Sequence, residues 1–222
     1  MATDNNGEAK RRAPLSRQSV FEAAVHLADR DGVAGLSMRR LAQELGVEAM
    51  SLYHHVANKE AILDGMVDLV FGEIELPATD VDWRVAMRRR ALSARRELLR
   101  HPWSVGLMET RKNPGPATLR HHDAVLGCLR RAGFSIALAG HVFSLIDSYV
   151  VGFVLQEQNI PIRTADELAG TAEKVATHMP EGDFPYLAEM MIHATQPGYA
   201  FADEFENGLD LILEGIARRR QG

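Results

Sequence analysis

Cysteine is almost missing from this sequence, and no long apolar stretch is free of polar groups. The single cysteine, Cys128, excludes a disulfide framework within the chain and is typical of a reducing compartment. Residues 1–12 are polar and lack the apolar core of a secretory signal, so we expect a cytoplasmic protein. The longest apolar segment, residues 136–155, contains His141 and Asp147. Because such groups are costly in lipid, we predict a buried protein helix there and no membrane partner.

The alternation of apolar and polar residues that marks strands is also missing. Helical spacing predominates, and we predict an all-α protein with helices over about residues 17–29, 38–45, 48–55, 59–74, 83–100, 103–110, 116–132, 135–159 and 201–219. One or two short helices are expected within residues 160–200. The chain should divide into three parts, which are a flexible basic arm (1–15), a small helical domain (16–75) and a larger helical domain (76–222).

A positive net charge, common in nucleic-acid-binding proteins, is absent, because the chain carries −5. Residues 1–60 carry eight Lys or Arg and eight Asp or Glu, so the negative balance comes from the rest of the chain. Positive charge in this first part is clustered, at residues 10–12 and at Arg39, Arg40 and Lys59. Such clusters permit contact with phosphate but do not establish it.

Residues 37–56, SMRRLAQELGVEAMSLYHHV, have the spacing of a helix-turn-helix, in which two short helices flank a turn with a glycine. Leu41 and Leu45 fall on the inner side of the first helix, and Gly46 permits the left-handed turn. At about 100° per residue, the second helix has two distinct sides. We expect the inner side to be Ala49, Leu52 and Val56, and the outer side to be Met50, Ser51 and His54. A helix in the major groove needs such an exposed side, but the pattern also occurs in bundles that never bind DNA.

Residues 15–67 resemble the DNA-binding domain of the tetracycline-repressor (TetR) family, most specifically in LAQELGVEAMSLYHHVANKEAILD. A weaker resemblance continues through RRELLRHPW, RRAGFSIALAGHVFSLIDSYVVGFVLQEQ and FADEFENGLDLILEGIARR, and it thins over residues 160–200. It implies a helix-turn-helix domain over residues 16–75 that binds a double-stranded DNA operator. It also implies that residues 76–222 bind a small-molecule inducer and form a homodimer through the last long helices.

The resemblance also implies which residues contact DNA. They are Ser37, Met38 and Arg39 from the first helix of the motif, Ala49, Met50, Ser51, Tyr53, His54 and His55 from the second, and Lys59 beyond it. We expect Arg39 to read a guanine, while Tyr53, His55 and Lys59 position the DNA backbone. Ala49 and Met50 depart from the residues of the tetracycline-binding members, so their operator sequence is not expected here.

Met108 stands where the tetracycline-binding members carry a histidine that coordinates the drug's magnesium ion, and a thioether is a poor ligand for that hard cation. The other drug-contact positions, which do not keep that chemistry, are Glu75, Arg90, Ala94 and Val125. We therefore expect an inducer other than magnesium–tetracycline, with no bound metal and no cofactor. By their positions on the helices, the candidate ligand-binding residues are Trp103, Met108, His121, Val125, Phe143 and Asp147.

Several of these candidates have a second interpretation. Trp103, Val125 and Phe143 are equally consistent with core positions. Asp147 lies in an apolar helix and needs a partner, which is the ligand, an arginine or a group across the dimer.

Other patterns are interpreted as structural. His121-His122-Asp123 is interpreted as a solvated face, the seven arginines of residues 84–100 as solvated or paired, and Cys128 as core. No phosphate-binding glycine loop or nucleophile elbow occurs, so we do not predict an enzyme. Two alternatives remain, a helical ligand carrier or an interaction protein that uses the face of residues 136–155, neither of which binds DNA.

Overall fold

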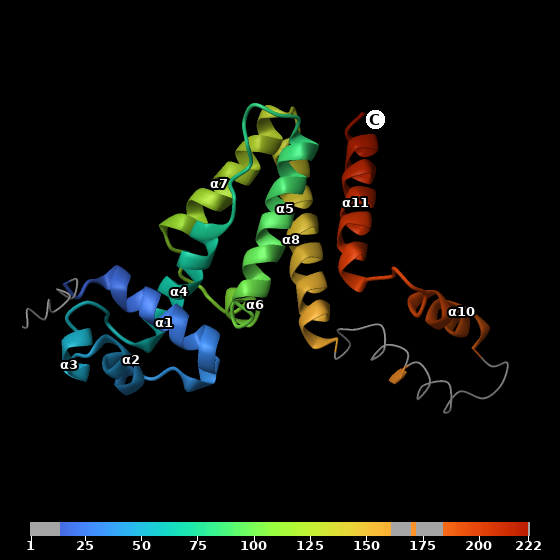
Figure 1. Cartoon of the computed structure of the whole chain (residues 1–222). Coiled ribbons are helices and arrows are strands. Elements are labelled where there is room, and N and C mark those ends of the chain that lie inside the picture. Colours follow the sequence, from blue (N-terminus) through green and yellow to red (C-terminus); the bar gives the residue numbers. More distant parts are fainter. Residues whose placement is uncertain (1–13, 161–169, 172–183, 222) are drawn as a thin grey trace, which may run out of the picture.

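The computed structural model describes residues 14–160, 170–171 and 184–221, and all regular elements within these ranges are helices (Figure 1). The helices are α1 (Arg17–Asp31), α2 (Met38–Leu45), α3 (Ala49–Leu52), α4 (Lys59–Glu73), α5 (Trp83–Arg100), α6 (Ser104–Met108), α7 (Pro116–Arg131), α8 (Ile136–Asn159), α10 (Pro185–Ala194) and α11 (Glu204–Gln221). Short 3-10 turns are η1 (Val33–Gly35) and η2 (Phe201–Asp203). The predicted all-α class is confirmed. Most of the expected basic arm and much of residues 160–200 lie outside the described residues.

The predicted helix starts are set by side-chain caps. The Ser16 hydroxyl accepts from the Ser19 N–H at 3.1 Å, and the Ser37 hydroxyl accepts from the Arg40 N–H at 3.3 Å. The Asn58 side chain accepts from the Ala61 N–H at 2.9 Å and opens α4. These bonds satisfy N–H groups that have no partner inside the first helical turn.

The helix predicted over residues 48–55 is wrong in its length. Helical structure ends at Leu52, after which the N–H groups of Tyr53, His54 and His55 reach back only three residues. This tighter turn directs Val56 into the core, where it is 4% exposed, before Asn58 caps α4. The last predicted helix likewise divides into η2 and α11.

The helices form two hydrophobic cores that share α4. The N-terminal core lies among α1, α2, α3 and the first half of α4, with Ile62 and Met66 inside it. The C-terminal core lies among α5, α7, α8, α11 and the second half of α4, with Val67 and Phe71 inside it. The two cores therefore meet inside one helix, and Figure 1 shows α4 running between them.

Helix α1 crosses α4 very closely at Gly65. A Cβ atom built there would lie 2.3 Å from the ring of Phe21, so only glycine allows this approach. The crossing brings the two helices together at the base of the N-terminal core.

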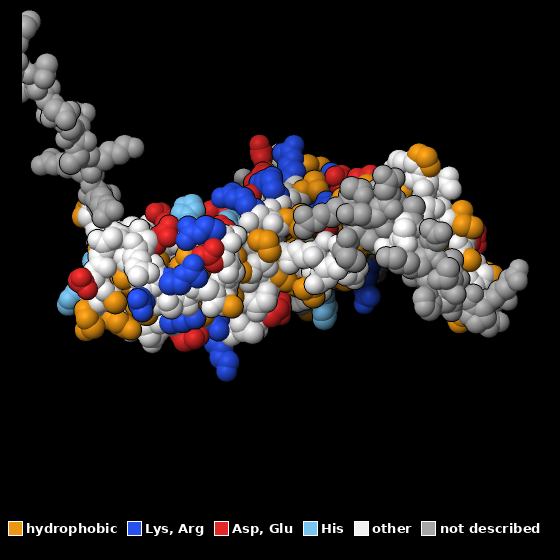
Figure 2. Space-filling model, turned by 60° about the horizontal axis from the view of Figure 1, so that its bottom comes forward, with side chains coloured by type: hydrophobic (Ala, Val, Ile, Leu, Met, Phe, Trp, Pro, Cys, Tyr) orange, Lys and Arg blue, Asp and Glu red, His pale blue; other side chains and the backbone are white. Residues whose placement is uncertain are grey.

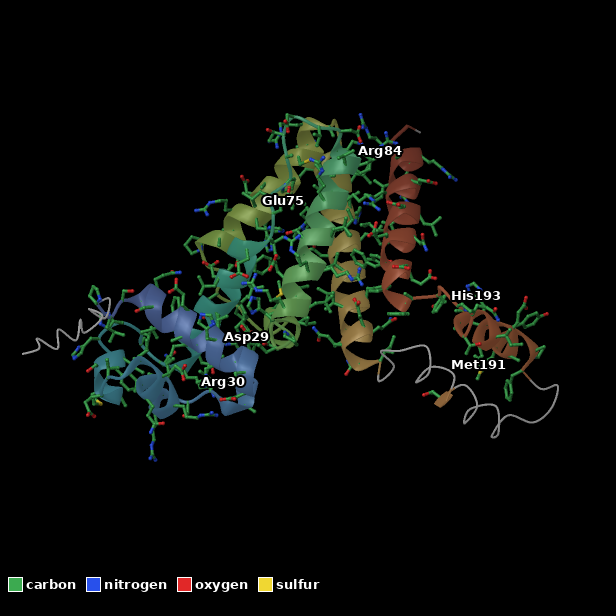
Figure 3. The ribbon with its side chains drawn as sticks, in the orientation of Figure 1. Asp29, Arg30, Glu75, Arg84, Met191 and His193 are labelled. Carbon is green, nitrogen blue, oxygen red and sulfur yellow. The ribbon has the colours of Figure 1, made fainter. Side chains whose placement is uncertain are left out.

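Helix α8 is long and apolar enough to span a membrane by length and composition, and 33% of its most apolar window is buried. One of its faces packs into the C-terminal core, as predicted, while Leu145 and Leu155 on another face are 48% and 49% exposed. Helix α10 has no buried residue, and Tyr186 is 84% exposed. Figure 3 shows α10, with Met191 and His193 labelled, standing away from the other helices. These apolar surfaces lack a cover within the described chain.

A polar junction joins α1, α4 and the end of α5. His101 is 3% exposed, with Nδ1 2.8 Å from Asp29 of α1 and Nε2 3.1 Å from Glu73 of α4. The indole N–H of Trp103 also donates to Asp29, at 2.6 Å. The ring of His101 thus places one nitrogen against each of the two carboxylates. Asp29 lies where α1 meets this junction (Figure 3).

Replacement His101→Ala is expected to lower the free energy of unfolding by about 1–3 kcal/mol, because the junction loses the buried ring that contacts both carboxylates. Equilibrium urea unfolding measures the change. The matched control is Arg30→Ala, since Arg30 pairs with Glu44 on the open surface and should matter little. Equal losses from both variants would contradict the joining role of His101.

Candidate DNA interface and ligand cavity

The turn between α2 and α3 has the geometry of a helix-turn-helix. Gly46 adopts the left-handed conformation, with φ 65° and ψ 39°, and the next N–H, of Val47, bonds the Ala42 carbonyl at 3.0 Å. Leu41 and Leu52 are both fully buried in the N-terminal core. These contacts fix how α3 is rotated against the rest of the domain.

The side of α3 that points away from the core is open. Met50 is 73% exposed and Tyr53 is 47% exposed, and His54 is exposed beside them. Ser51 and His55 are half-buried, and Ala49 packs partly against the core. The predicted separation into an inner and an outer side therefore holds, except that Ser51 is only partly accessible.

The adjacent arginines of α2 are in different situations. Arg40 ion-pairs with Asp31 and donates to the Gly35 carbonyl at 3.0 Å, so it braces the connection between α1 and α2. Arg39 is exposed and bonds no acceptor within the part of the chain that the structure describes. The sequence alone did not separate these two residues, because Asp31 lies in the preceding helix.

The remaining candidates for DNA contact surround this surface. Ser37 is exposed but uses its hydroxyl as the cap of α2, while Met38 is half-buried against the N-terminal core. Lys59 is exposed at the first turn of α4. Figure 2 shows Lys and Arg side chains on this end of the molecule, mixed with acidic and apolar ones. The candidates thus lie on the exposed ends of α2, α3 and α4.

A cavity of about 660 Å³ lies in the C-terminal part, between α4, the connection from α6 to α7, the start of α7 and the middle of α8. Met108, Phe143 and Asp147, which are three of the six predicted ligand-binding residues, line it. The sequence missed the other lining residues, among them Arg111 and His122. His122 lies one helical turn after the lining residue Thr118, so helical spacing places both side chains on the same face of α7.

The other three predicted ligand-binding residues lie outside the cavity lining. Val125 is 1% exposed inside the C-terminal core. Trp103 packs against both cores and bonds Asp29. His121 is fully buried behind the cavity, where it contacts Arg90.

The interpretation of residues 121–123 as a solvated face is wrong for both histidines. His121 is buried and His122 half-buried, with ring centroids 5.5 Å from Phe71 and 5.1 Å from Phe143 respectively. This face of α7 turns toward α4 and α8, so only Asp123 is exposed.

Asp147 has the arginine partner that its apolar surroundings require. Arg90, 3% exposed, donates from its NH1 group to Oδ1 of Asp147 and from Nε to Nε2 of His121 at 3.0 Å. Other arginines of α5 are also paired, such as Arg88 with Asp210 of α11 and Arg95 with Glu157 of α8. The prediction that the arginines of this helix are solvated or paired is confirmed, because Arg89 is exposed and the other six have carboxylate partners.

Burial governs the protonation of both histidines. Burial, followed by the charges of Arg90 and His122, lowers the pKa of His121 from 6.5 to about 3. The ring is therefore neutral, and because Nε2 accepts from Arg90, the proton is on Nδ1. Burial also lowers the pKa of His122, against the opposing charge of Asp147.

Three carboxylates at one-turn intervals fasten the cavity wall to α4. Glu60 accepts from NH1 of Arg111 at 2.6 Å, and Asp64 accepts from the side chain of Asn113 at 3.3 Å. Asp68 accepts from the N–H and hydroxyl of Thr118, at 2.8 Å and 2.9 Å. The segment that bounds the cavity therefore holds α4 along its length. Among the described residues, no group of three His, Cys, Asp or Glu is placed to hold a metal ion.

Comparison with known proteins gives consistent matches over both parts. Residues 20–66 match the model of bacterial regulatory proteins of the tetR family, and residues 76–220 match the tetracyclin repressor-like C-terminal domain. An HTH-type transcriptional regulator of Saccharopolyspora erythraea is 37% identical over 91% of this chain and 85% of its own. The class A tetracycline repressor of Escherichia coli is 34% identical over 93% of this chain and 92% of its own.

Solved structures agree with these relatives. The TetR family protein ActR of Streptomyces coelicolor, in complex with actinorhodin, superimposes with a TM-score of 0.75 at 30% identity, covering 93% of this chain and 98% of that one. The likeness includes both the helix-turn-helix and the helical domain with the cavity. The chain belongs to the TetR family of transcriptional regulators, which are DNA-binding proteins and not enzymes.

Proposed function

We propose that this chain is a ligand-responsive repressor that binds a near-palindromic operator as a homodimer and is released by a small molecule other than magnesium–tetracycline. The observation that carries the proposal is that α4 contributes to both sites. Lys59, at its first turn, lies beside the exposed surface of α3, and Asp64 and Phe71 line the cavity. Lys59 and Asp64 are separated by about 7.5 Å along the helix axis.

DNA binding is assigned to residues 16–75, with the exposed outer side of α3 in the major groove. A dimer places two such helices in successive grooves, roughly 34 Å apart, which calls for a near-palindromic operator. Arg39, which has no bonded partner among the described residues, is available for a guanine, while Lys59 meets phosphate at a helix N-terminus. The exposed Met50 suits contact with a thymine methyl group.

Release is assigned to residues 76–222, which line the ligand cavity together with α4. A molecule in the cavity touches α4 directly and also Arg111, which is bonded to Glu60 beside Lys59. A shift of these groups tilts α4 and changes the distance between the two reading helices of the dimer. The ligand must favour the non-binding state by about 1–3 kcal/mol or more. Met108 lines the cavity with a thioether, whereas a hard cation needs oxygen or nitrogen ligands. This supports an inducer other than magnesium–tetracycline.

The homodimer is assigned to the exposed faces of the last long helices, α8 and α11. Leu145 and Leu155 of α8 are 48% and 49% exposed, and Leu211 of α11 is 72% exposed, and exposed apolar surface of this kind marks an interaction site. A second copy of the chain covers these faces, and such a soluble dimer acts in the cytoplasm. A ligand carrier without DNA binding remains the second candidate, and it predicts no salt-dependent affinity for DNA.

Replacement Arg39→Ala is expected to weaken operator binding by about 1–3 kcal/mol and to relax preference at one base pair, because a guanine loses its donor. Binding-site selection followed by fluorescence anisotropy measures both effects. Arg40→Ala is the matched control, since Arg40 is already bonded to Asp31 and Gly35, and it should change unfolding rather than base preference. Equal loss on specific and random DNA for Arg39→Ala would refute the base contact.

Replacement Lys59→Ala is expected to weaken binding to all DNA sequences by a similar factor, because phosphate carries no sequence information. The slope of log affinity against log salt concentration should fall by about 1. Titrations of operator and random duplexes at several salt concentrations test this. A loss confined to the operator would assign Lys59 to base reading instead.

Replacement Leu145→Glu is expected to convert a dimer into a monomer, because it places a charge in the proposed apolar interface. Sedimentation equilibrium should give twice the chain mass of 24.6 kDa for the wild type and one chain mass for the variant. Leu119→Glu is the matched control, since Leu119 is 55% exposed on α7 and outside the proposed interface. A wild-type monomer would contradict the proposal.

A further inference from the structure

The ligand cavity has one polar wall whose charges are arranged unevenly. Its lining includes three carboxylates, Asp64, Glu109 and Asp147, and one arginine, Arg111. Arg111 donates from NH1 to Glu60 at 2.6 Å and is 3.6 Å from Asp64, while its buried Nε has no hydrogen-bond partner among the described residues. Within the described lining, three carboxylates therefore stand against one guanidinium, and negative charge predominates.

Asp147 is the carboxylate that is held in place and still accessible. Its Oδ1 accepts from Arg90, and its side chain is 29% exposed toward the cavity. Its Oδ2 accepts no hydrogen bond from the described residues. Arg90 is itself fixed by His121, with Nε at 3.0 Å and NH2 at 2.8 Å from Nε2. A carboxylate oriented in this way presents one free acceptor to a bound molecule.

His121 adds no positive charge beside Asp147. It is neutral because its pKa lies at about 3, and its Nε2 is occupied by Arg90. Asp147 is the carboxylate that pairs with the guanidinium of Arg90, whose side chain is 3% exposed. The positive charge near the cavity lies behind the carboxylate, so a ligand meets Asp147 before it meets Arg90.

The neighbouring wall is aromatic. Phe71, His122 and Phe143 follow one another, with ring centroids 5.5 Å apart for Phe71 and His122 and 5.1 Å apart for His122 and Phe143. Met108 adds a polarizable side chain to the same lining. Such a wall favours contact with a flat aromatic body, whose rings pack against these edges and faces.

We propose that the cavity takes a flat aromatic molecule without negative charge, which donates a hydrogen bond from an amine or a hydroxyl group to Asp147. This inference rests on the proposed function, because it names the chemical class of the inducer. The excess of carboxylates over guanidinium groups in the described lining disfavours aromatic acids. Asp147 is the specificity-determining residue of the site.

The test uses three anthraquinones that share one ring system. 2-(Aminomethyl)anthraquinone carries a positive charge at neutral pH, 2-(hydroxymethyl)anthraquinone is a neutral donor, and anthraquinone-2-carboxylate is an anion. Isothermal titration of the full chain at pH 7 should give an affinity for the amine at least tenfold above that for the carboxylate, with the alcohol in between. A carboxylate that binds as tightly as the amine, or binding of none of the three at millimolar concentration, overturns the inference.

Replacement Asp147→Asn tests the assigned residue. It keeps the size of the side chain and removes its charge, so the affinity for the amine should fall at least tenfold while that for the carboxylate stays or rises. Glu109→Gln is the matched control, since Glu109 also lines the cavity but is exposed, and it should change the preference little. Equal effects of both variants would show a diffuse charge effect and refute the specific role of Asp147.

Two measurements keep the test decisive. Because Asp147→Asn leaves Arg90 buried without its partner, circular dichroism is used to check that the variant folds. The comparison of the three ligands on the wild type does not depend on any variant. DNA binding is titrated separately. DNA binding together with a preference for the carboxylate contradicts only the inference. A preference for the amine without DNA binding contradicts only the proposed function.

Discussion

The arrangement of this protein depends on one shared helix, because α4 contributes side chains to both hydrophobic cores. Ile62 and Met66 belong to the N-terminal core, and Val67 and Phe71 to the C-terminal one. A helix is stiff along its axis, so a displacement at one core is carried into the other. The acidic side chains at 60, 64 and 68 fasten the same helix to the cavity wall. The cavity and the surface of α3 are therefore mechanically joined without a flexible connection between them.

The sequence predicted what depends on local structure. The helix starts at residues 17, 38 and 59 and the turn at Gly46 are decided within a few residues, and each lies where it was expected. The need of Asp147 for a partner also followed, since a carboxylate in an apolar helix requires one, but which of the three candidates it was, Arg90, came only from the structure. The end of α3 was misplaced because the position of Val56 in the core, and not local propensity, decides where the helix stops.

Features that depend on contacts between distant residues were not accessible in this way. The sequence did not reveal that Arg40 is held by Asp31 while its neighbour Arg39 is open, nor that Arg111 reaches Glu60 across 51 positions. His121 and His122 were assigned to solvent because neighbours on a helix point in different directions. That reasoning fails where a helix is covered on two sides, as α7 is by α4 and α8. Such residues need tertiary packing to be interpreted.

The close crossing of α1 and α4 at Gly65 has a consequence for how the exposed surface of α3 moves. With the ring of Phe21 against the α4 backbone, neither helix has room to slide past the other. The first three helices must then follow α4 as one rigid body. A small rotation at the cavity is thereby enlarged into a sideways step at the far end of that body, where Met50 is exposed.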